Sequence, residues 1–234
     1  MLDRIFAAES AALETLKDDP GRSVLKRVAV DGRQFVVKRY RVPWWKTRLL
    51  HPLRLSQVWR EYRGAQRLAR VGCRASIPLA IVCQHDRGRE AQALILPYIE
   101  GTSLDRLLEQ APPAAQWSNE YRQKRLQLAR VVGGQIQRLL AARIVNRDCK
   151  LSNLIMDEAC EHRGAEPVMI DPLGLRRRRS RRQVMRMLAV LLRTSLRAGP
   201  VTVREGMTCL RAALSDRPAS AVARQVLALS RRGG

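Results

Sequence analysis

The feature that most constrains the fold is a change in apolar patterning near residue 100. Four segments rich in Val, Ile and Leu precede it: 22–30, 33–40, 77–83 and 92–99. Asp31-Gly32 separates the first two segments, and this dipeptide between β-type runs predicts a tight hairpin. A polar turn at residues 84–90 is expected to join the last two. We therefore predict a small, β-rich first part.

Beyond residue 101 the spacing of apolar residues becomes helical. Helices are predicted there over 103–110, 120–142 and most of 181–231. A further helix is predicted over 56–72, between the second and third strands. Short strands are expected at 154–156 and 167–170. This order predicts an α+β, two-lobed chain. Its parts are an N-lobe over residues 1–96, a hinge at 97–101 and a helical C-lobe over 102–234.

Charge is the most unusual feature of the composition. The chain carries 44 Lys+Arg against 21 Asp+Glu, a formal net charge of +23. Such a surface attracts polyanions such as nucleic acid, anionic lipid or phosphorylated glycolipid, although many of these arginines are also explained as a solvated, Arg-rich surface. The five cysteines show no metal-binding or disulfide spacing, and the first residues lack the regions of a secretory signal. Both observations favour a reducing cytoplasm.

The segment from Asn146 to Asn153, NRDCKLSN, carries the most specific chemical signal. An Asp followed five residues later by an Asn is the pattern of a kinase catalytic loop, with Asn in place of the usual first His. In that pattern Asp148 takes the proton of the acceptor hydroxyl, Lys150 neutralises the transferring phosphoryl group and Asn153 binds magnesium. The structural alternative is a polar loop in which Asn and Asp only cap and turn the chain.

Two further segments supply the remaining parts. Asp171 ends the apolar run VMID, and with Asn153 it gives two hard oxygen ligands that suit Mg²⁺. Lys38 ends the run FVVK, which matches the strand lysine that contacts ATP phosphates. Glu61 is the only acidic residue between Ser56 and Gly72, so we expect it to pair with Lys38 when nucleotide is bound.

Taken together, these residues resemble a protein-kinase-like enzyme, and the chain is most similar to the lipopolysaccharide kinase (Kdo/WaaP-like) family. The resemblance covers about residues 20–195 and includes the helix with Arg60-Glu61-Tyr62 and the strand and hinge ALILPYIEG. It implies the cofactors ATP and Mg²⁺, with adenine between the lobes against Pro97, Tyr98 and Ile99. It also implies that the enzyme phosphorylates a sugar hydroxyl of the lipopolysaccharide core.

The sequence departs from the wider kinase pattern in two places. No GxGxxG loop precedes the first hairpin, and only residues 18–21 offer a turn that could cover phosphates. No Ala-Pro-Glu follows Asp171, so a peptide-docking activation segment is not expected. The acceptor therefore stays open at this point.

A basic run begins five residues after Asp171. Arg176, Arg177, Arg178 and Arg179 are expected to bind an anionic acceptor, most simply a phosphorylated glycolipid, because guanidinium groups offer forked donors to phosphate. Trp44 and Trp45 could anchor the chain at the cytoplasmic face of the inner membrane, since indoles favour the headgroup region. Packing on the N-lobe explains the two tryptophans equally well.

Four other functions compete with this interpretation. Lys150 and Asn153 would suit a small atypical protein Ser/Thr kinase, but the short segment after Asp171 argues against one. An aminoglycoside-type phosphotransferase would need an acidic acceptor pocket. Nucleic-acid binding is not favoured, because the run RRRRSRR lacks interleaved aromatic residues. A catalytically inactive kinase is disfavoured because Asp148, Asn153 and Asp171 are all present.

Overall fold

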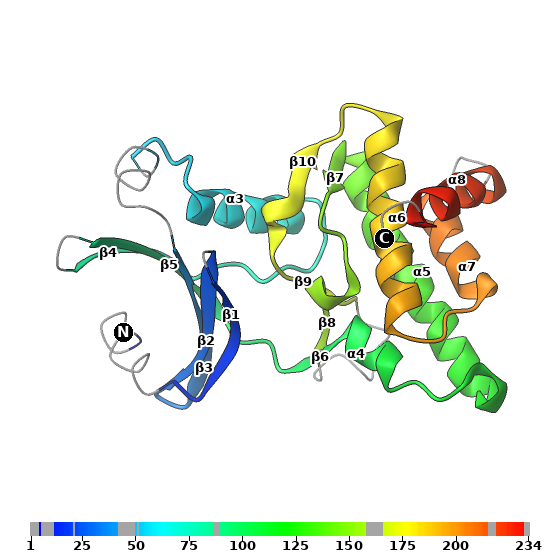
Figure 1. Ribbon diagram of the computed structural model, residues 1–234, viewed down its shortest axis with the longest axis horizontal. Helices are drawn as coiled ribbons and strands as arrows, with labels where there is room; N and C mark the ends of the chain where they lie inside the picture. The colour runs from blue at the N-terminus through cyan, green and yellow to red at the C-terminus, as the bar shows by residue number, and fades with distance from the viewer. Residues whose placement is uncertain are drawn as a thin grey trace. The chain divides into compact units, whose positions relative to one another are not determined.

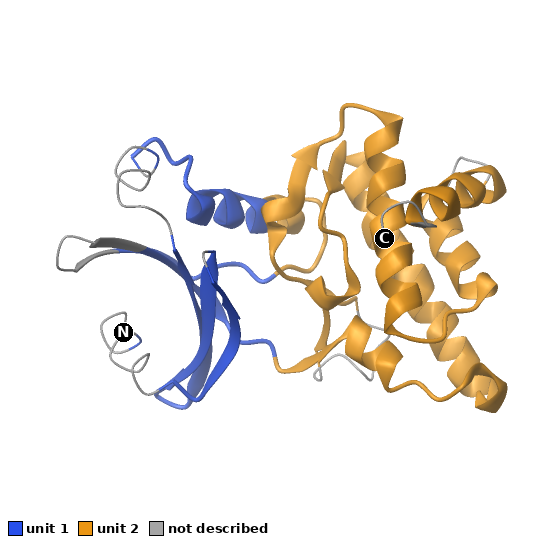
Figure 2. Cartoon of the chain, in the orientation of Figure 1, with its two compact units in different colours: residues 1–66, 76–99 blue, residues 67–75, 100–234 orange. Residues whose placement is uncertain are grey.

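The structure is a computed structural model that describes residues 5, 12–20, 22–41, 50, 52–86, 89–157, 166–214 and 219–231. The chain forms two compact units (Figure 2), the first built from residues 1–66 and 76–99 and the second from residues 67–75 and 100–234. Trp44, Trp45 and Gly21 lie outside the described residues. In the part that the structure describes, no helix is long and apolar enough to cross a bilayer.

Unit 1 is built on a five-stranded antiparallel sheet of order β1-β2-β3-β5-β4 (Figure 1). Its strands are β1 (Glu14–Asp19), β2 (Ser23–Val30), β3 (Arg33–Tyr40), β4 (Ala80–Asp86) and β5 (Arg89–Pro97). The predicted β2–β3 hairpin is present, and its turn residues Asp31 and Gly32 have φ values of 53° and 73°. These left-handed conformations are what a two-residue hairpin turn requires. A small apolar cluster from β2, β3 and β5 packs on one face of the sheet.

Two details of this sheet differ from the sequence prediction. Residues 84–90 were expected to be a turn, but β4 and β5 continue pairing to Asp86↔Arg89, because a backbone ladder needs no apolar side chains. Strand β1 was not predicted. Its side chains are exposed along almost the whole strand, so it lacks the alternation of apolar and polar residues that marks a half-buried strand.

Unit 2 is mainly helical. It contains α4 (Leu104–Glu109), α5 (Asn119–Ala141), α6 (Arg181–Ala198), α7 (Val203–Ala213) and α8 (Ala219–Arg231), together with the end of α3 (Gln57–Arg70). Helix α5 packs on α7, and α6 packs on α8, around one apolar core. Ser180 and Thr202 cap α6 and α7 with capping boxes, which satisfy the free amides at both helix starts.

Two small sheets of unit 2 carry the polar loops. One has the order β6-β8-β9, from β6 (Gly101–Ser103), β8 (Leu154–Asp157) and β9 (Val168–Met169). The other pairs β7 (Ile144–Asn146) with β10 (Leu175–Arg177). The strand predicted at 167–170 is therefore shorter than expected. Strands β6, β7 and β10 were not predicted, since three-residue strands form through tertiary pairing and leave little periodic signal.

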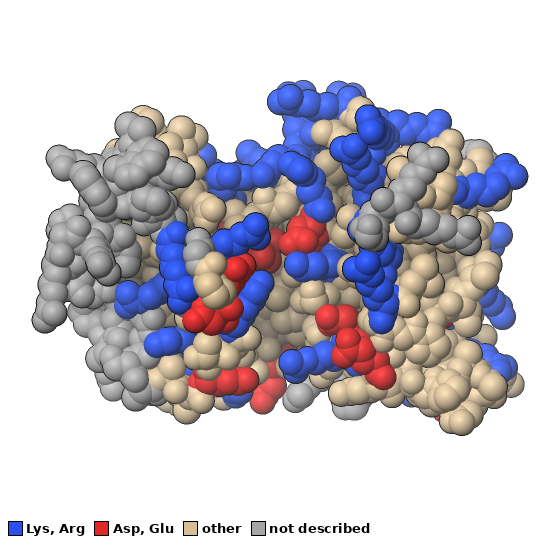
Figure 3. All heavy atoms as spheres, in the orientation of Figure 1, with Lys and Arg blue, Asp and Glu red and all other residues tan. Residues whose placement is uncertain are grey.

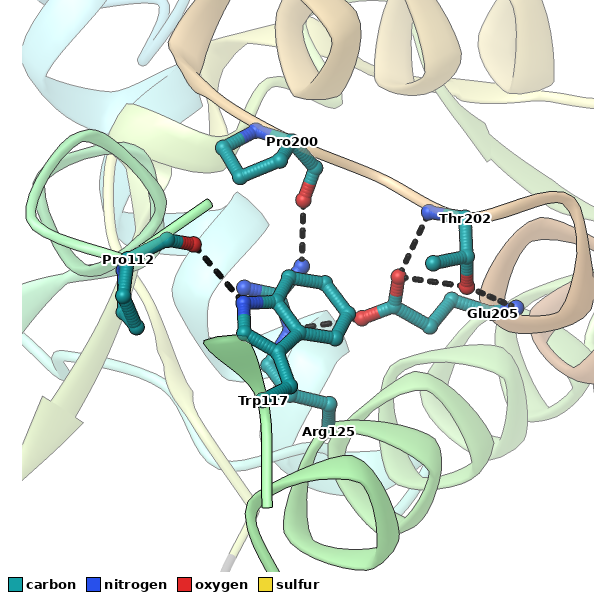
Figure 4. Close-up of polar contacts among 6 residues, drawn as sticks. All are labelled: Pro112, Trp117, Arg125, Pro200, Thr202 and Glu205. Atoms are coloured by element: carbon teal, nitrogen blue, oxygen red, sulfur yellow. Dashed lines mark hydrogen bonds and ion pairs between the residues drawn. The ribbon is translucent and has the colours of Figure 1, made fainter. Parts of the chain in front are cut away.

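A buried ion pair joins α5 to α7 (Figure 4). The Nε of Arg125 donates to Oε1 of Glu205 at 2.5 Å, and its Nη2 donates to the Pro200 carbonyl at 2.8 Å. The Trp117 ring lies over the guanidinium, 4.6 Å from ring centroid to carbon. Glu205 also accepts from the amide and hydroxyl of Thr202, so one carboxylate both caps α7 and fixes it to α5.

Candidate active site

The loop after β7 brings the predicted catalytic residues of unit 2 together. Asp148 follows the end of β7, and Asn153 ends the short 3-10 helix Leu151–Asn153. The Nδ2 of Asn153 donates to the main-chain oxygen of Asp148 at 3.0 Å and to its carboxylate at 3.3 Å. Lys150 lies 3.3 Å from the same carboxylate, from Nζ to Oδ2. The Asp148 side chain remains 44% exposed, so its carboxylate is accessible to an acceptor hydroxyl.

Asn146 and Gly174 shape this loop, and sequence reasoning did not assign them a role. The Asp148 amide donates to Oδ1 of Asn146 at 3.0 Å, and the Arg147 amide donates to the Gly174 carbonyl at 3.0 Å. A Cβ at Gly174 would lie 2.3 Å from Oδ1 of Asn146 and 2.8 Å from the Asp148 amide nitrogen. The side chain at the altered first position of the motif therefore holds the backbone of Asp148. Only glycine allows the chain after Asp171 to return this closely.

Asp171 is placed beside the loop by main-chain hydrogen bonding. The amide of Ile170 donates to the carbonyl of Asn153 at 2.9 Å. The residue directly before Asp171 is therefore bonded to Asn153, the other proposed metal ligand. Asp171 has φ 52° and ψ 64°, and Pro172 then starts a short 3-10 helix. This left-handed conformation is uncommon for a non-glycine residue and turns the chain sharply at the end of the strand.

The donors of this loop fit magnesium rather than a metal that is held by protein ligands alone. The described residues contain no cluster of three or more His, Cys, Asp or Glu side chains. Because the side-chain amide nitrogen of Asn153 donates hydrogen bonds to Asp148, the side-chain amide oxygen is the atom that can face a cation. One carboxylate, one amide oxygen, water and substrate phosphates form the kind of oxygen set that Mg²⁺ uses.

Unit 1 contains the predicted lysine–glutamate pair. The Nζ of Lys38 on β3 lies 3.0 Å and 2.8 Å from the two carboxylate oxygens of Glu61 on α3, and both residues are buried. The Tyr40 hydroxyl donates to the same carboxylate. Sequence reasoning missed Tyr40, although residues two apart on a strand share one face and the spacing from Lys38 could have identified it. The tyrosine fixes the glutamate, which in turn fixes the lysine.

The predicted hinge residues lie at and after the end of β5. Pro97 pairs with Phe35 of β3, and the Tyr98 amide donates to the Gln34 carbonyl at 3.2 Å. The Arg27 guanidinium lies 4.2 Å from the centroid of the Tyr98 ring. Ile99 is the last residue of unit 1. In this arrangement the Tyr98 amide is already engaged within the sheet.

The four arginines predicted to bind the acceptor do not share one environment. Arg176 and Arg177 belong to β10, and the Nη1 of Arg176 donates to the carbonyls of Leu173 and Leu175. Arg177 and Arg179 are exposed, and Arg178 is half-buried. Figure 3 shows Lys and Arg side chains gathered on the face of unit 2 that carries β10 and α6. Arg176 therefore supports the chain after Asp171, while Arg177 and Arg179 face solvent.

Comparison with known families explains this set of residues. The profile of the lipopolysaccharide kinase (Kdo/WaaP) family matches residues 7–213, which is most of the chain. The chain belongs to the lipopolysaccharide kinase (Kdo/WaaP) family. A comparison with curated protein sequences found no match.

A solved structure of WaaP in complex with acyl carrier protein shares the fold. The match has a TM-score of 0.69 and 19% sequence identity, and it covers 97% of this chain and 90% of the other. At this identity the likeness establishes the fold alone. The α+β, protein-kinase-like fold predicted from the sequence is thus confirmed. Membership of a kinase family makes phosphotransfer the general chemistry of this lipopolysaccharide kinase homologue.

One side chain within residues 146–153 of this Kdo/WaaP family member is a buried thiol. Cys149 lies between Asp148 and Lys150 and is 4% exposed. Burial raises the pKa of the Cys149 thiol to about 12, with a smaller contribution from Cys209. A thiol with that pKa stays protonated at neutral pH, and the thiolate is the nucleophilic form. Cys149 therefore packs in the apolar core as a protonated thiol.

Proposed function

We propose that this chain transfers the γ-phosphoryl group of ATP to a hydroxyl of a lipopolysaccharide core sugar or a related glycolipid. The observation that carries the proposal is the interlocked loop of unit 2. There the side-chain amide of Asn153 donates to Asp148, and the main-chain carbonyl of Asn153 accepts from the amide of Ile170, directly before Asp171. The family match supports the reaction class and the proposal of a lipopolysaccharide acceptor.

Asp148 is proposed to orient the acceptor hydroxyl and accept its proton. Its carboxylate is exposed, and its position is fixed by Asn146 on one side and Asn153 on the other. Lys150, close to the same carboxylate, would compensate negative charge on the phosphoryl group that is transferred. Phosphoryl transfer depends mainly on such positioning and charge compensation, so this loop supplies what the protein must contribute.

Asn153 and Asp171 are proposed to hold Mg²⁺. The bound ion would supply charge compensation at the nucleotide phosphates. Lys38 is proposed to contact those phosphates, since its pairing with Glu61 holds the ammonium group at one position on β3. The adenine is proposed to meet the main chain of residues 97–99. Because the Tyr98 amide already donates to Gln34, the carbonyl groups of this segment and the Ile99 amide remain the groups that could bind it.

The acceptor is proposed to be anionic and to meet Arg177, Arg178 and Arg179. Six arginines between residues 176 and 182 repel one another unless anions are close. Strand β10 pairs with β7, the strand that leads into the catalytic loop, and places Arg177 opposite Ile144, four residues before Asp148. A phosphorylated glycolipid at the cytoplasmic face of the inner membrane has the required charge, and we propose a cytoplasmic protein with peripheral membrane contact.

A panel of acceptors tests the proposed function. Purified protein with ATP and Mg²⁺ would be offered dephosphorylated lipopolysaccharide core, a generic protein substrate such as casein, and oligonucleotide, with the transferred phosphate measured in each. We expect label in the lipopolysaccharide fraction that depends on Asp148. Label in casein alone would favour the small protein kinase alternative. Tight oligonucleotide binding without any transfer would instead favour the nucleic-acid-binding alternative.

A further inference from the structure

The strand that leads to Asp171 is held weakly by its own sheet. Strand β9 contains two residues, Val168 and Met169, which pair with Ile155 and Leu154 of β8, and one isolated bridge links Met169 to Ala75. A ladder this short makes few hydrogen bonds, so it cannot by itself fix a side chain to the fraction of an ångström that a metal ligand requires. The position of Asp171 must therefore depend on contacts made outside the ladder.

Gln135 makes one of these contacts from the middle of α5. Its Nε2 donates to the Pro167 carbonyl at 2.7 Å, directly before β9. The side chain is fully buried, and within the described part of the chain its Oε1 has no hydrogen-bond partner. A buried acceptor without a partner costs free energy, which methionine of similar length would avoid. Methionine would, however, leave the Pro167 carbonyl without this donor, so the contact with Pro167 is what the glutamine supplies.

Two arginines hold the same segment from other directions. Arg138, one turn after Gln135 on α5, forms an ion pair with Glu166. The guanidinium of Arg74 donates to the Glu166 carbonyl at 3.0 Å and to Oδ2 of Asp157 at 2.9 Å, so it joins the end of β8 to the start of β9. The Arg74 carbonyl also accepts from the Met169 amide at 2.9 Å. All these residues belong to unit 2.

We propose that Gln135, Arg138 and Arg74 form a clamp on residues 166–169 that sets the position of Asp171 for metal binding. These are positioning residues, since they act through the strand. The effect of the clamp on catalysis rests on the proposed function. The clamp itself is a property of the chain without ligands. Partners that orient a metal ligand from outside the coordination shell typically contribute about 10- to 100-fold in metal affinity or activity.

The test compares Gln135→Met with Leu139→Met, a matched substitution on the same helix at a buried residue that has no polar contact with the clamp. Hydrogen exchange of the peptide covering residues 166–175 would be followed by mass spectrometry without ligand. Two amides in this peptide report directly, those of Met169 and Ile170, which are bonded to Arg74 and Asn153. We expect about tenfold faster exchange in Gln135→Met and unchanged exchange in Leu139→Met.

The same proteins are then assayed for phosphotransfer over a range of Mg²⁺ concentrations. For Gln135→Met we expect the half-activating Mg²⁺ concentration to rise about tenfold, with the acceptor KM unchanged. Arg138→Met should behave similarly, and Arg138→Lys, which keeps a cation for Glu166, should be closer to wild type. Unchanged exchange in Gln135→Met would overturn the clamp. Faster exchange with an unchanged Mg²⁺ requirement would overturn its positioning role. Wild-type protein without phosphotransfer would overturn the proposed function, while the exchange result would still decide on the clamp.

Discussion

Replacing Gly174 by alanine should disable the catalytic loop without greatly destabilising the fold. The added Cβ would lie 2.3 Å from Oδ1 of Asn146, whereas real contacts of this kind do not fall below 3.0 Å. The difference, 3.0 − 2.3 = 0.7 Å, is the smallest movement that the loop must make. The second close atom is the amide nitrogen of Asp148, at 2.8 Å, so rotating one side chain does not remove the clash.

A displacement of about 1 Å at a reacting group can lower the rate about 100-fold, so we expect turnover of Gly174→Ala to fall about 10- to 100-fold. The measurement is kcat for phosphotransfer beside a denaturant unfolding curve. Gly134→Ala is the matched control, because a Cβ there meets nothing within 4 Å and alanine in a helix interior is favoured over glycine by about 0.5–1 kcal/mol. Turnover of Gly174→Ala within twofold of wild type would refute the argument that close approach shapes this loop.

Three further predictions follow from other contacts. Lys38→Met should lower kcat/KM for ATP about 100-fold in a steady-state assay, because a preorganised charge at the phosphates is lost; an unchanged ATP dependence would remove the lysine from the site. Changing Arg177–Arg179 to Gln should raise the acceptor KM and leave the ATP KM nearly unchanged, with a smaller acceptor effect at high salt; a loss of ATP affinity instead would assign the run to the nucleotide. Glu205→Gln should cost about 3–5 kcal/mol in denaturant unfolding, because it leaves a buried guanidinium without its counter-charge. Glu120→Gln, in the exposed ion pair with Lys124 within α5, should leave the free energy of unfolding nearly unchanged, and equal costs would contradict the burial argument.

The sequence was informative where function depends on residue type and order. The pairing of Lys38 with Glu61 was predictable because a strand lysine precedes a helix with one acidic residue, and the structure contains the pair. The hairpin at Asp31-Gly32 was predictable because few dipeptides adopt two left-handed conformations in succession. Asp148 and Asn153 were found by their spacing, and their hydrogen bonding agrees with one shared loop, although their roles stay predictions.

The residues that were missed act through contacts between distant parts of the chain. The approach of Gly174 to Asn146 requires the chain to return across 28 residues, and the contact of Gln135 with Pro167 spans 32. No local sequence pattern indicates contacts between residues this far apart in the chain. The arginines at β10 also show this limit. The charge run was visible in the sequence, but only the structure shows that Arg176 bonds to nearby carbonyls while Arg177 and Arg179 face solvent.

The most direct test of the central claim is phosphate transfer from labelled ATP to dephosphorylated lipopolysaccharide core by wild-type protein, Asp148→Asn and Asp171→Asn. Circular dichroism would establish that all three proteins are folded. The account predicts Mg²⁺-dependent transfer by wild type and a loss of about 100- to 10,000-fold in each variant, since one removes the proposed general base and the other a proposed metal ligand. Transfer by folded Asp148→Asn within twofold of wild type would contradict the account.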